Sequence, residues 1–167
     1  MKSTNLPHPP PPTPSAELAS MRKLNRAATK VFLALVDGLL VGSARRIDNA
    51  AGASMVVSVD YLVGGRVAPT GTRDGSLYAV AHRYEVNGDL VPDPDVEFYV
   101  VDDPVEPARK AVYPTAIDHG PLGYRRHVHF DSTGQPVRVA SRGQVDLAIF
   151  CDLWMTNIAI QQGLVLS

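Results

Sequence analysis

The stretch SLYAVAHRYEVNGDLVPDPDVEFYVV, residues 76–101, determines most of the predicted fold. Its first part, residues 76–86, has strand character: an apolar run over residues 77–81 is followed by residues that alternate with a period of two, with His82 and Tyr84 on one face and Arg83 and Glu85 on the other. Asn87-Gly88 follows directly, and this dipeptide is a strong signal for the turn of a β-hairpin. The chain is therefore expected to reverse direction here and to form an antiparallel pair of strands.

Two prolines change the prediction for the second part of this stretch. A two-residue turn would place Pro92 and Pro94 in the returning strand, although proline has no N–H to donate to a ladder of hydrogen bonds. We therefore predict a longer loop over residues 87–95 and a returning strand over residues 96–101. In this prediction the acidic residues between the prolines lie in a shaped loop.

Further segments with strand character lie on both sides of this hairpin. They cover residues 54–63, 111–117, 124–130 and 136–140, and turn residues separate them. The predicted fold class is α+β, with an antiparallel sheet of about five strands, a long N-terminal helix and a packed C-terminal helix.

The domain organisation follows from composition. Residues 1–14 contain six prolines and little apolar material, so we predict a Pro-rich extended arm there. Residues 15–167 are predicted to form a single α+β domain, since a chain of 167 residues has the usual length of one domain.

The N-terminal helix is predicted to run from Ser15 to about residue 41, where Gly42 ends it. At 100° per residue its apolar stripe consists of Met21, Leu24, Ala28, Val31, Phe32, Leu35 and Leu39. The opposite face is basic and consists of Arg22, Lys23, Arg26 and Lys30. This helix is expected to lie on the sheet with its basic face outward.

The C-terminal helix, about residues 142–162, has apolar residues on two sides. The broader stripe consists of Leu147, Phe150, Cys151, Trp154, Met155 and Ile158. The second stripe consists of Ile149, Leu153 and Ile160. Two stripes imply that both sides are covered, one by the sheet and the other by helix 15–41 or by another subunit.

The overall composition is that of an ordinary globular protein, with 45% hydrophobic and 20% charged residues. Cys151 is the single cysteine, so an internal disulfide is excluded, and its apolar neighbours predict a buried side chain. The longest apolar run, residues 31–42, is too short to cross a bilayer, and the N-terminus lacks the apolar core of a signal peptide. We expect a cytoplasmic protein without a membrane partner.

Charge is segregated along the chain, although the net charge is only −1. Residues 1–47 are basic, whereas residues 74–106 are acidic and contain Arg83 as their only basic residue. Such asymmetry concerns partners and self-association rather than the fold. It favours a protein partner, including a second copy of this chain.

A metal-dependent hydrolase or nuclease is an alternative reading of the acidic stretch. Its ligands would be His82, Glu85 and Asp89, together with His127 or His129. However, strand alternation places His82 and Glu85 on opposite faces, and no complete metal-binding or nucleophile motif is present in the sequence. We therefore expect no cofactor.

Nucleic-acid binding is a second alternative. Arg125 and Arg126 could contact phosphates together with the basic helix face, although no sequence signature of a nucleic-acid-binding fold accompanies them. In a third alternative, an assembly subunit would use the extended N-terminal arm to reach a neighbour.

Two motifs resemble a known family. The stretch AHRYEVNGDLVPDPDVEFYV (81–100) and the later WMTNIAIQQGL (154–164) resemble a family of small uncharacterised proteins, a domain of unknown function. The matching positions are His82, Tyr84, Asn87, Gly88, Asp89, Asp93, Pro94, Glu97, Phe98, Trp154, Asn157, Gln162 and Gly163. We associate this family with conjugative plasmids and integrative elements of proteobacteria. The resemblance covers about residues 33–164, departs from the family at the basic run 125–127, and implies a genomic setting rather than an activity.

From these observations we expect a non-enzymatic binding or regulatory protein of a mobile genetic element. It would act through protein–protein contacts, with host or defence factors among the candidate partners. The predicted binding residues are Arg22, Lys23, Arg26, Lys30, Asp89, Asp93, Asp95, Arg125 and Arg126.

Overall fold

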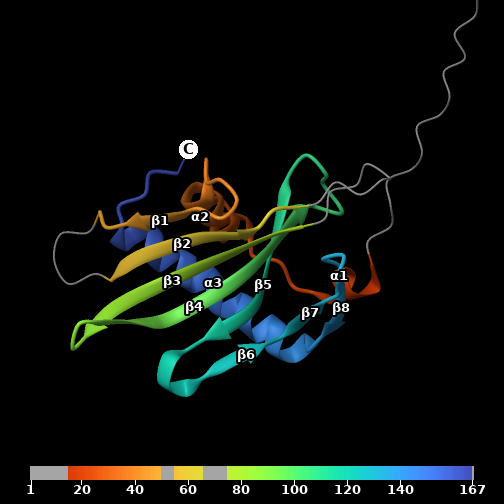
Figure 1. Cartoon of the computed structure of the whole chain (residues 1–167). Helices are drawn as coiled ribbons and strands as arrows, with labels where there is room; N and C mark the ends of the chain where they lie inside the picture. Colours follow the sequence, from red (N-terminus) through yellow and green to blue (C-terminus); the bar gives the residue numbers. More distant parts are fainter. Residues whose placement is uncertain (1–14, 50–54, 66–74, 167) are drawn as a thin grey trace, which may run out of the picture.

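The described residues of the computed structural model are 15–49, 55–65 and 75–166 (Figure 1). The predicted arm, residues 1–14, lies outside them. Within these ranges, a six-stranded antiparallel sheet has the strand order β1-β2-β3-β4-β5-β6, and β7 and β8 form a second, small sheet. The elements are α1 (Ala16–Ser20), α2 (Arg26–Val36), β1 (Ala44–Ile47), β2 (Val56–Val63), β3 (Ser76–Val86), β4 (Asp89–Asp102), β5 (Lys110–Asp118), the 3-10 helix η1 (Gly120–Leu122), β6 (Tyr124–Arg126), β7 (Val128–Phe130), β8 (Pro136–Val139) and α3 (Ser141–Gln161). The predicted α+β class is confirmed.

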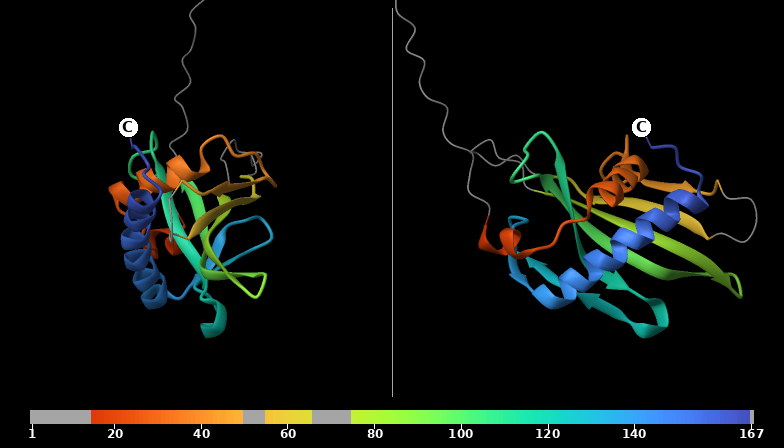
Figure 2. Two further views of the ribbon diagram at one scale, coloured as in Figure 1. Left: turned by 90° about the vertical axis from the view of Figure 1, so that its left-hand side faces the viewer. Right: turned by 180° about the vertical axis from the view of Figure 1, so that it is seen from behind.

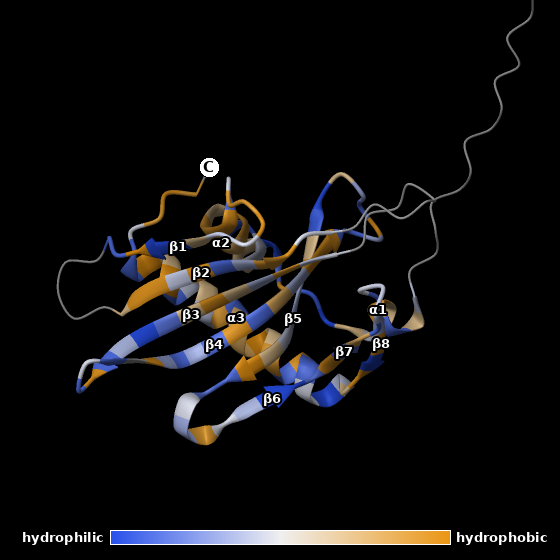
Figure 3. Cartoon of the chain, in the orientation of Figure 1, coloured by the Kyte–Doolittle hydropathy of each residue, from blue (hydrophilic) through white to orange (hydrophobic). Residues whose placement is uncertain are grey.

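Helices α2 and α3 cover one face of the six-stranded sheet, as the edge view in Figure 2 shows. Below them, buried aliphatic residues of neighbouring strands lie opposite one another: Val59 pairs with Val80, and Val80 with Val96. Side chains alternate between the faces of a strand, which gives parts of β2 and β4 the alternating hydropathy visible in Figure 3. The main core therefore lies between the helices and this face.

A smaller core lies on the opposite face, at one end of the sheet. Tyr99 and Tyr113 are paired across β4 and β5 and pack there with Met21 and Val128. Helix α1 and the β7-β8 hairpin cover this smaller core. The predicted strand over 124–130 is thus two strands, β6 and β7, which belong to different sheets.

The long N-terminal helix was a wrong prediction. The chain leaves the helical conformation at Met21, whose φ and ψ are −86° and 143°, and α2 starts anew after its N-cap Asn25. The connecting backbone is hydrogen-bonded elsewhere: the Leu24 N–H donates to the Val112 carbonyl at 2.8 Å, and the Arg22 N–H donates to Gln144 Oε1 at 2.8 Å. These bonds replace the intrahelical ones, so the break has little energetic penalty.

The loop predicted over 87–95 was also wrong, because Asn87-Gly88 forms a tight two-residue turn with positive φ values of 53° and 89°. Strand β4 starts directly after it, at Asp89, and contains both prolines. The pairing of β4 with β5 begins only at Asp95, opposite Asp118. The first residues of β4 therefore form a sheet edge, which is the position where a strand tolerates proline.

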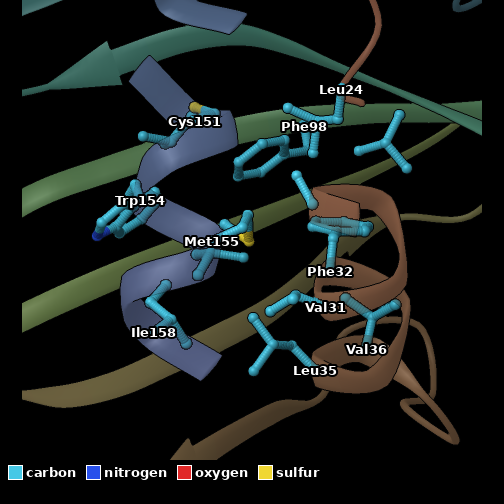
Figure 4. Packing of buried hydrophobic residues seen from close by; sticks show 14 of the residues in the cluster. Leu24, Val31, Phe32, Leu35, Val36, Phe98, Cys151, Trp154, Met155 and Ile158 are labelled. Atoms are coloured by element: carbon cyan, nitrogen blue, oxygen red, sulfur yellow. The ribbon is translucent and has the colours of Figure 1, made fainter. Parts of the chain in front are cut away.

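The C-terminal helix was predicted within one residue at each end. Its broader apolar stripe is buried against the sheet and α2, apart from Phe150, which is 37% exposed (Figure 4). Among the described residues, no helix is long and apolar enough to cross a membrane.

Candidate binding surfaces

The end of the β3-β4 hairpin extends beyond the neighbouring strands (Figure 1). Strand β2 pairs with β3 only as far as Arg83, and β5 pairs with β4 only from Asp95 onward. Between these two points, β3 and β4 pair only with each other. We call residues 84–93 the hairpin tip.

The hairpin tip is acidic. Glu85, Asp89 and Asp93 are exposed, and the sequence of the tip contains no basic residue. No described strand pairs with either edge of the tip, although η1 approaches the β4 edge at Val91 and Pro92. The absence of an N–H at Pro92 weakens any pairing of β4 with a further strand. The arrangement therefore presents carboxylates on a two-stranded support and discourages strand addition.

Asp95, in contrast, belongs to a network of charged residues on the sheet face away from α2 and α3. Its carboxylate lies 3.8 Å from the Arg83 guanidinium, and burial raises the pKa of Asp95 although Arg83 opposes the shift. In the same network, Arg126 contacts both carboxylate oxygens of Glu97 at 2.9 and 3.2 Å. Asp95 and Arg126 are thus engaged within the fold, whereas Arg125 is exposed.

The four basic residues predicted on one helix face divide into two groups. Arg22 and Lys23 lie in the extended connection between α1 and α2, where Arg22 pairs with Asp152 at 2.9 Å and Lys23 pairs with Asp103. Arg26 and Lys30 lie one turn apart on α2 and are exposed. The predicted continuous basic stripe is therefore divided, because the first pair serves the packing of α3 and of the β4-β5 connection.

His82 lies in the core and not on a metal-binding surface. It is 3% exposed, and its Nδ1 accepts a hydrogen bond of 3.1 Å from Nε1 of Trp154. Its Nε2 is buried without a hydrogen-bond partner among the described residues. Burial lowers the pKa of His82, while the Asp93 carboxylate acts in the opposite direction. His82 and Trp154 are 72 positions apart in the sequence, so no local spacing could reveal their contact.

Acid is expected to destabilise the protein through this residue. The folded chain holds His82 neutral with a pKa below the ordinary 6.5, so as the pH falls below about 6.5 protons bind preferentially to the unfolded chain. The melting temperature should therefore fall between about pH 7 and pH 5. His82→Gln, which retains an acceptor for Trp154, should show a shallower fall.

Comparing the pH dependence of the melting temperature between the wild-type chain and His82→Gln isolates the contribution of His82. The pKa of His127 is also lowered by burial, but that residue is present in both proteins. Equal slopes of melting temperature against pH would contradict the assignment to His82.

The other predicted metal ligands lie apart. The ring of His127 lies against Gly143 at the start of α3, and Nε2 of His129 is 2.9 Å from Nη2 of Arg138. Glu85 is exposed on the hairpin tip. Within the described ranges, no group of three or more His, Cys, Asp or Glu side chains could hold a metal ion. Cys151 is buried, as predicted, and burial raises the pKa of its thiol.

Three buried polar side chains that the sequence analysis did not select connect distant segments. Gln144 bonds Arg22 and Pro114, Asp152 bonds Arg22 and Asn25, and Gln162 bonds Asn49 and Met55. Polar residues within a helix are usually solvated, so the sequence gives no signal for these roles. They position α2 and β1 rather than a reactive group.

The comparisons with known proteins give one match. Residues 30–164 match the model of a family described as a domain of unknown function (DUF6908). No curated protein and no solved structure matches the chain.

Proposed function

Because this chain belongs to the DUF6908 family, a domain of unknown function, we propose a role from its exposed surfaces. The proposed role is that of a non-enzymatic binding or regulatory protein of a mobile genetic element, which acts through protein–protein contacts. The genomic setting comes from the resemblance of the two motifs described above. Host and defence factors are the partners that such a setting favours.

The hairpin tip is the observation that carries this proposal. Its carboxylates of Glu85, Asp89 and Asp93 are exposed, and the tip is the part of the hairpin that neither β2 nor β5 flanks. An acidic projection fits a partner with a basic surface or groove, because complementary charge steers the encounter and fixes the orientation of the complex. The hairpin tip supports recognition of a basic protein surface.

The structure also separates the tip from the internal charges. Of the predicted acidic binding residues, Asp89 and Asp93 lie on the tip, whereas Asp95 faces Arg83. The partner is therefore proposed to contact Asp89 and Asp93, with Glu85 beside them, and not Asp95. The basic residues Arg26 and Lys30 are on α2, a separate element.

Affinity capture from extracts of a host cell tests this proposal. The wild-type chain is compared with Asp89→Asn/Asp93→Asn and with a control of equal net charge, Asp37→Asn/Asp48→Asn, whose two residues are exposed elsewhere. We expect a partner that the wild type and the control retain and that the tip variant loses. Retention of the same proteins by all three chains would contradict a role for the tip.

A further inference from the structure

The outer face of α3 is apolar and without charge along most of its length. From Leu147 to Gln161, the only charged residue is Asp152, which is 9% exposed and paired with Arg22. Leu153 is 68% exposed and Ile160 is 74% exposed. Figure 2 shows from behind that no other described element lies over this helix. A solvated helix face normally carries charged residues, whereas the centre of an interface is depleted of them.

The exposed residues form a regular seam. Ile149, Leu153, Thr156 and Ile160 follow one another at steps of four, three and four residues, and all four are exposed. This spacing is that of the a and d positions of a coiled coil. A strict a/d stripe is narrower than the face that a helix presents to a globular core, so it fits a second helix.

The seam is symmetric about its own centre. Ile149 and Ile160 are equally distant from the midpoint between Trp154 and Met155, and so are Leu153 and Thr156. An antiparallel second copy of α3 would therefore place each isoleucine opposite the other isoleucine, and each leucine opposite a threonine. Such a self-complementary patch is what a two-fold dimer interface requires.

We propose that the chain forms a two-fold dimer in which the α3 helices of two copies pack antiparallel along this seam. The charges are compatible with it, because Asp146 would face the uncharged Gly163 of the second copy, and antiparallel helix dipoles attract. The Arg22–Asp152 pair neutralises the acidic residue beside the seam. Phe150, 37% exposed on the flank, would cover Asn157 of the second copy.

The contact between the two helices is small for a dimer interface. In this register the two α3 helices overlap over residues 148–161, a length of about 21 Å. A single helix pair of this length belongs to the lower end of the size range of stable interfaces, about 1,200 Å² in total. We therefore expect a dissociation constant on the order of micromolar, and a dimer that forms and dissociates with concentration.

Sedimentation velocity over a concentration series tests the seam directly. The wild-type chain is expected to shift from monomer to dimer. Leu153→Glu, at an exposed position that does not disturb the core, should weaken dimerisation by at least about a hundredfold, because two buried carboxylates would lie near the symmetry axis. Val105→Glu, at a position 81% exposed outside α3, is the matched control and should dimerise like the wild type. A wild-type chain that stays monomeric, or an unchanged Leu153→Glu variant, overturns the proposal.

Cysteine pairs test the antiparallel register. Within one helix, positions 149 and 160 are about 16 Å apart, beyond the reach of a disulfide. The double variant Ile149→Cys/Ile160→Cys should therefore oxidise to a covalent dimer, whereas Ile149→Cys or Ile160→Cys alone should not. Cross-linking of either single variant as efficient as that of the double variant would indicate a parallel or unrelated contact and would overturn the register.

Discussion

Replacing Phe32 by alanine is expected to lower the free energy of unfolding by about 3–5 kcal/mol. Phe32 is fully buried on α2, and its ring centroid lies 4.9 Å from that of Phe98 (Figure 4). The Tyr78 ring centroid lies 5.7 Å away. Alanine would leave a cavity between α2 and β4 and would remove both aromatic contacts, which a close-packed core cannot refill.

Urea unfolding followed by circular dichroism measures this effect. Phe32→Leu is the control, since it keeps most of the volume and is expected to cost about 1–2 kcal/mol. If alanine were no more destabilising than leucine, Phe32 would not be at the centre of the main core.

Asp152→Ala is expected to cost about 2–4 kcal/mol, somewhat less than the loss from a fully buried ion pair because Arg22 is partly exposed. The Asp152 carboxylate accepts a 2.9 Å hydrogen bond from the Arg22 guanidinium and a 2.8 Å bond from the Asn25 N–H. Alanine would leave both donors without this acceptor at the point where α2 begins. Urea unfolding followed by circular dichroism measures this loss as well.

Asp152→Asn separates the two contributions. Asparagine keeps an oxygen for the Asn25 N–H but loses the charge that faces Arg22. The free energy of unfolding of Asp152→Asn should therefore lie between those of the wild type and Asp152→Ala. If asparagine and alanine destabilised equally, the hydrogen bond to Asn25 would contribute nothing, and the account of the helix break would be incorrect.

The sequence predicted elements well where the signal is local. The strand character of residues 76–86 and the stripes of α3 identified β3 and α3 with accurate bounds. The N-terminal helix failed because the bonds that compensate for its interruption come from Gln144 and Asp152, more than 100 residues away. No periodicity within residues 15–41 contains that information.

The hairpin shows a second reason for failure. A proline is unfavourable inside a sheet, and the rule was applied to Pro92 and Pro94 as if β4 had neighbours along its whole length. Because β5 reaches only Asp95, the first part of β4 is an edge, where the rule does not hold. Which strands end where is a property of the whole sheet, so the sequence of one hairpin does not predict it.

The candidate binding residues were predicted by type and not by environment. The sequence analysis grouped Asp95 with Asp89 and Asp93, but in the sheet the Asp95 carboxylate lies beside the Arg83 guanidinium. It grouped Arg22 and Lys23 with Arg26 and Lys30, but the first two hold Asp152 and Asp103. Ion pairs between distant segments cannot be predicted from residue spacing. The second apolar stripe of α3 could be predicted, because its residues follow a helical spacing within one segment.

Titration calorimetry of the captured partner, purified, tests the central claim most directly. The partner is titrated with the wild-type chain, with Asp89→Asn/Asp93→Asn and with the control Asp37→Asn/Asp48→Asn, each at low and at physiological salt. We predict that the tip variant binds at least about tenfold more weakly, a difference of about 1.4 kcal/mol, and that salt weakens the wild-type complex. Equal affinities of the wild type and the tip variant would contradict recognition through the hairpin tip.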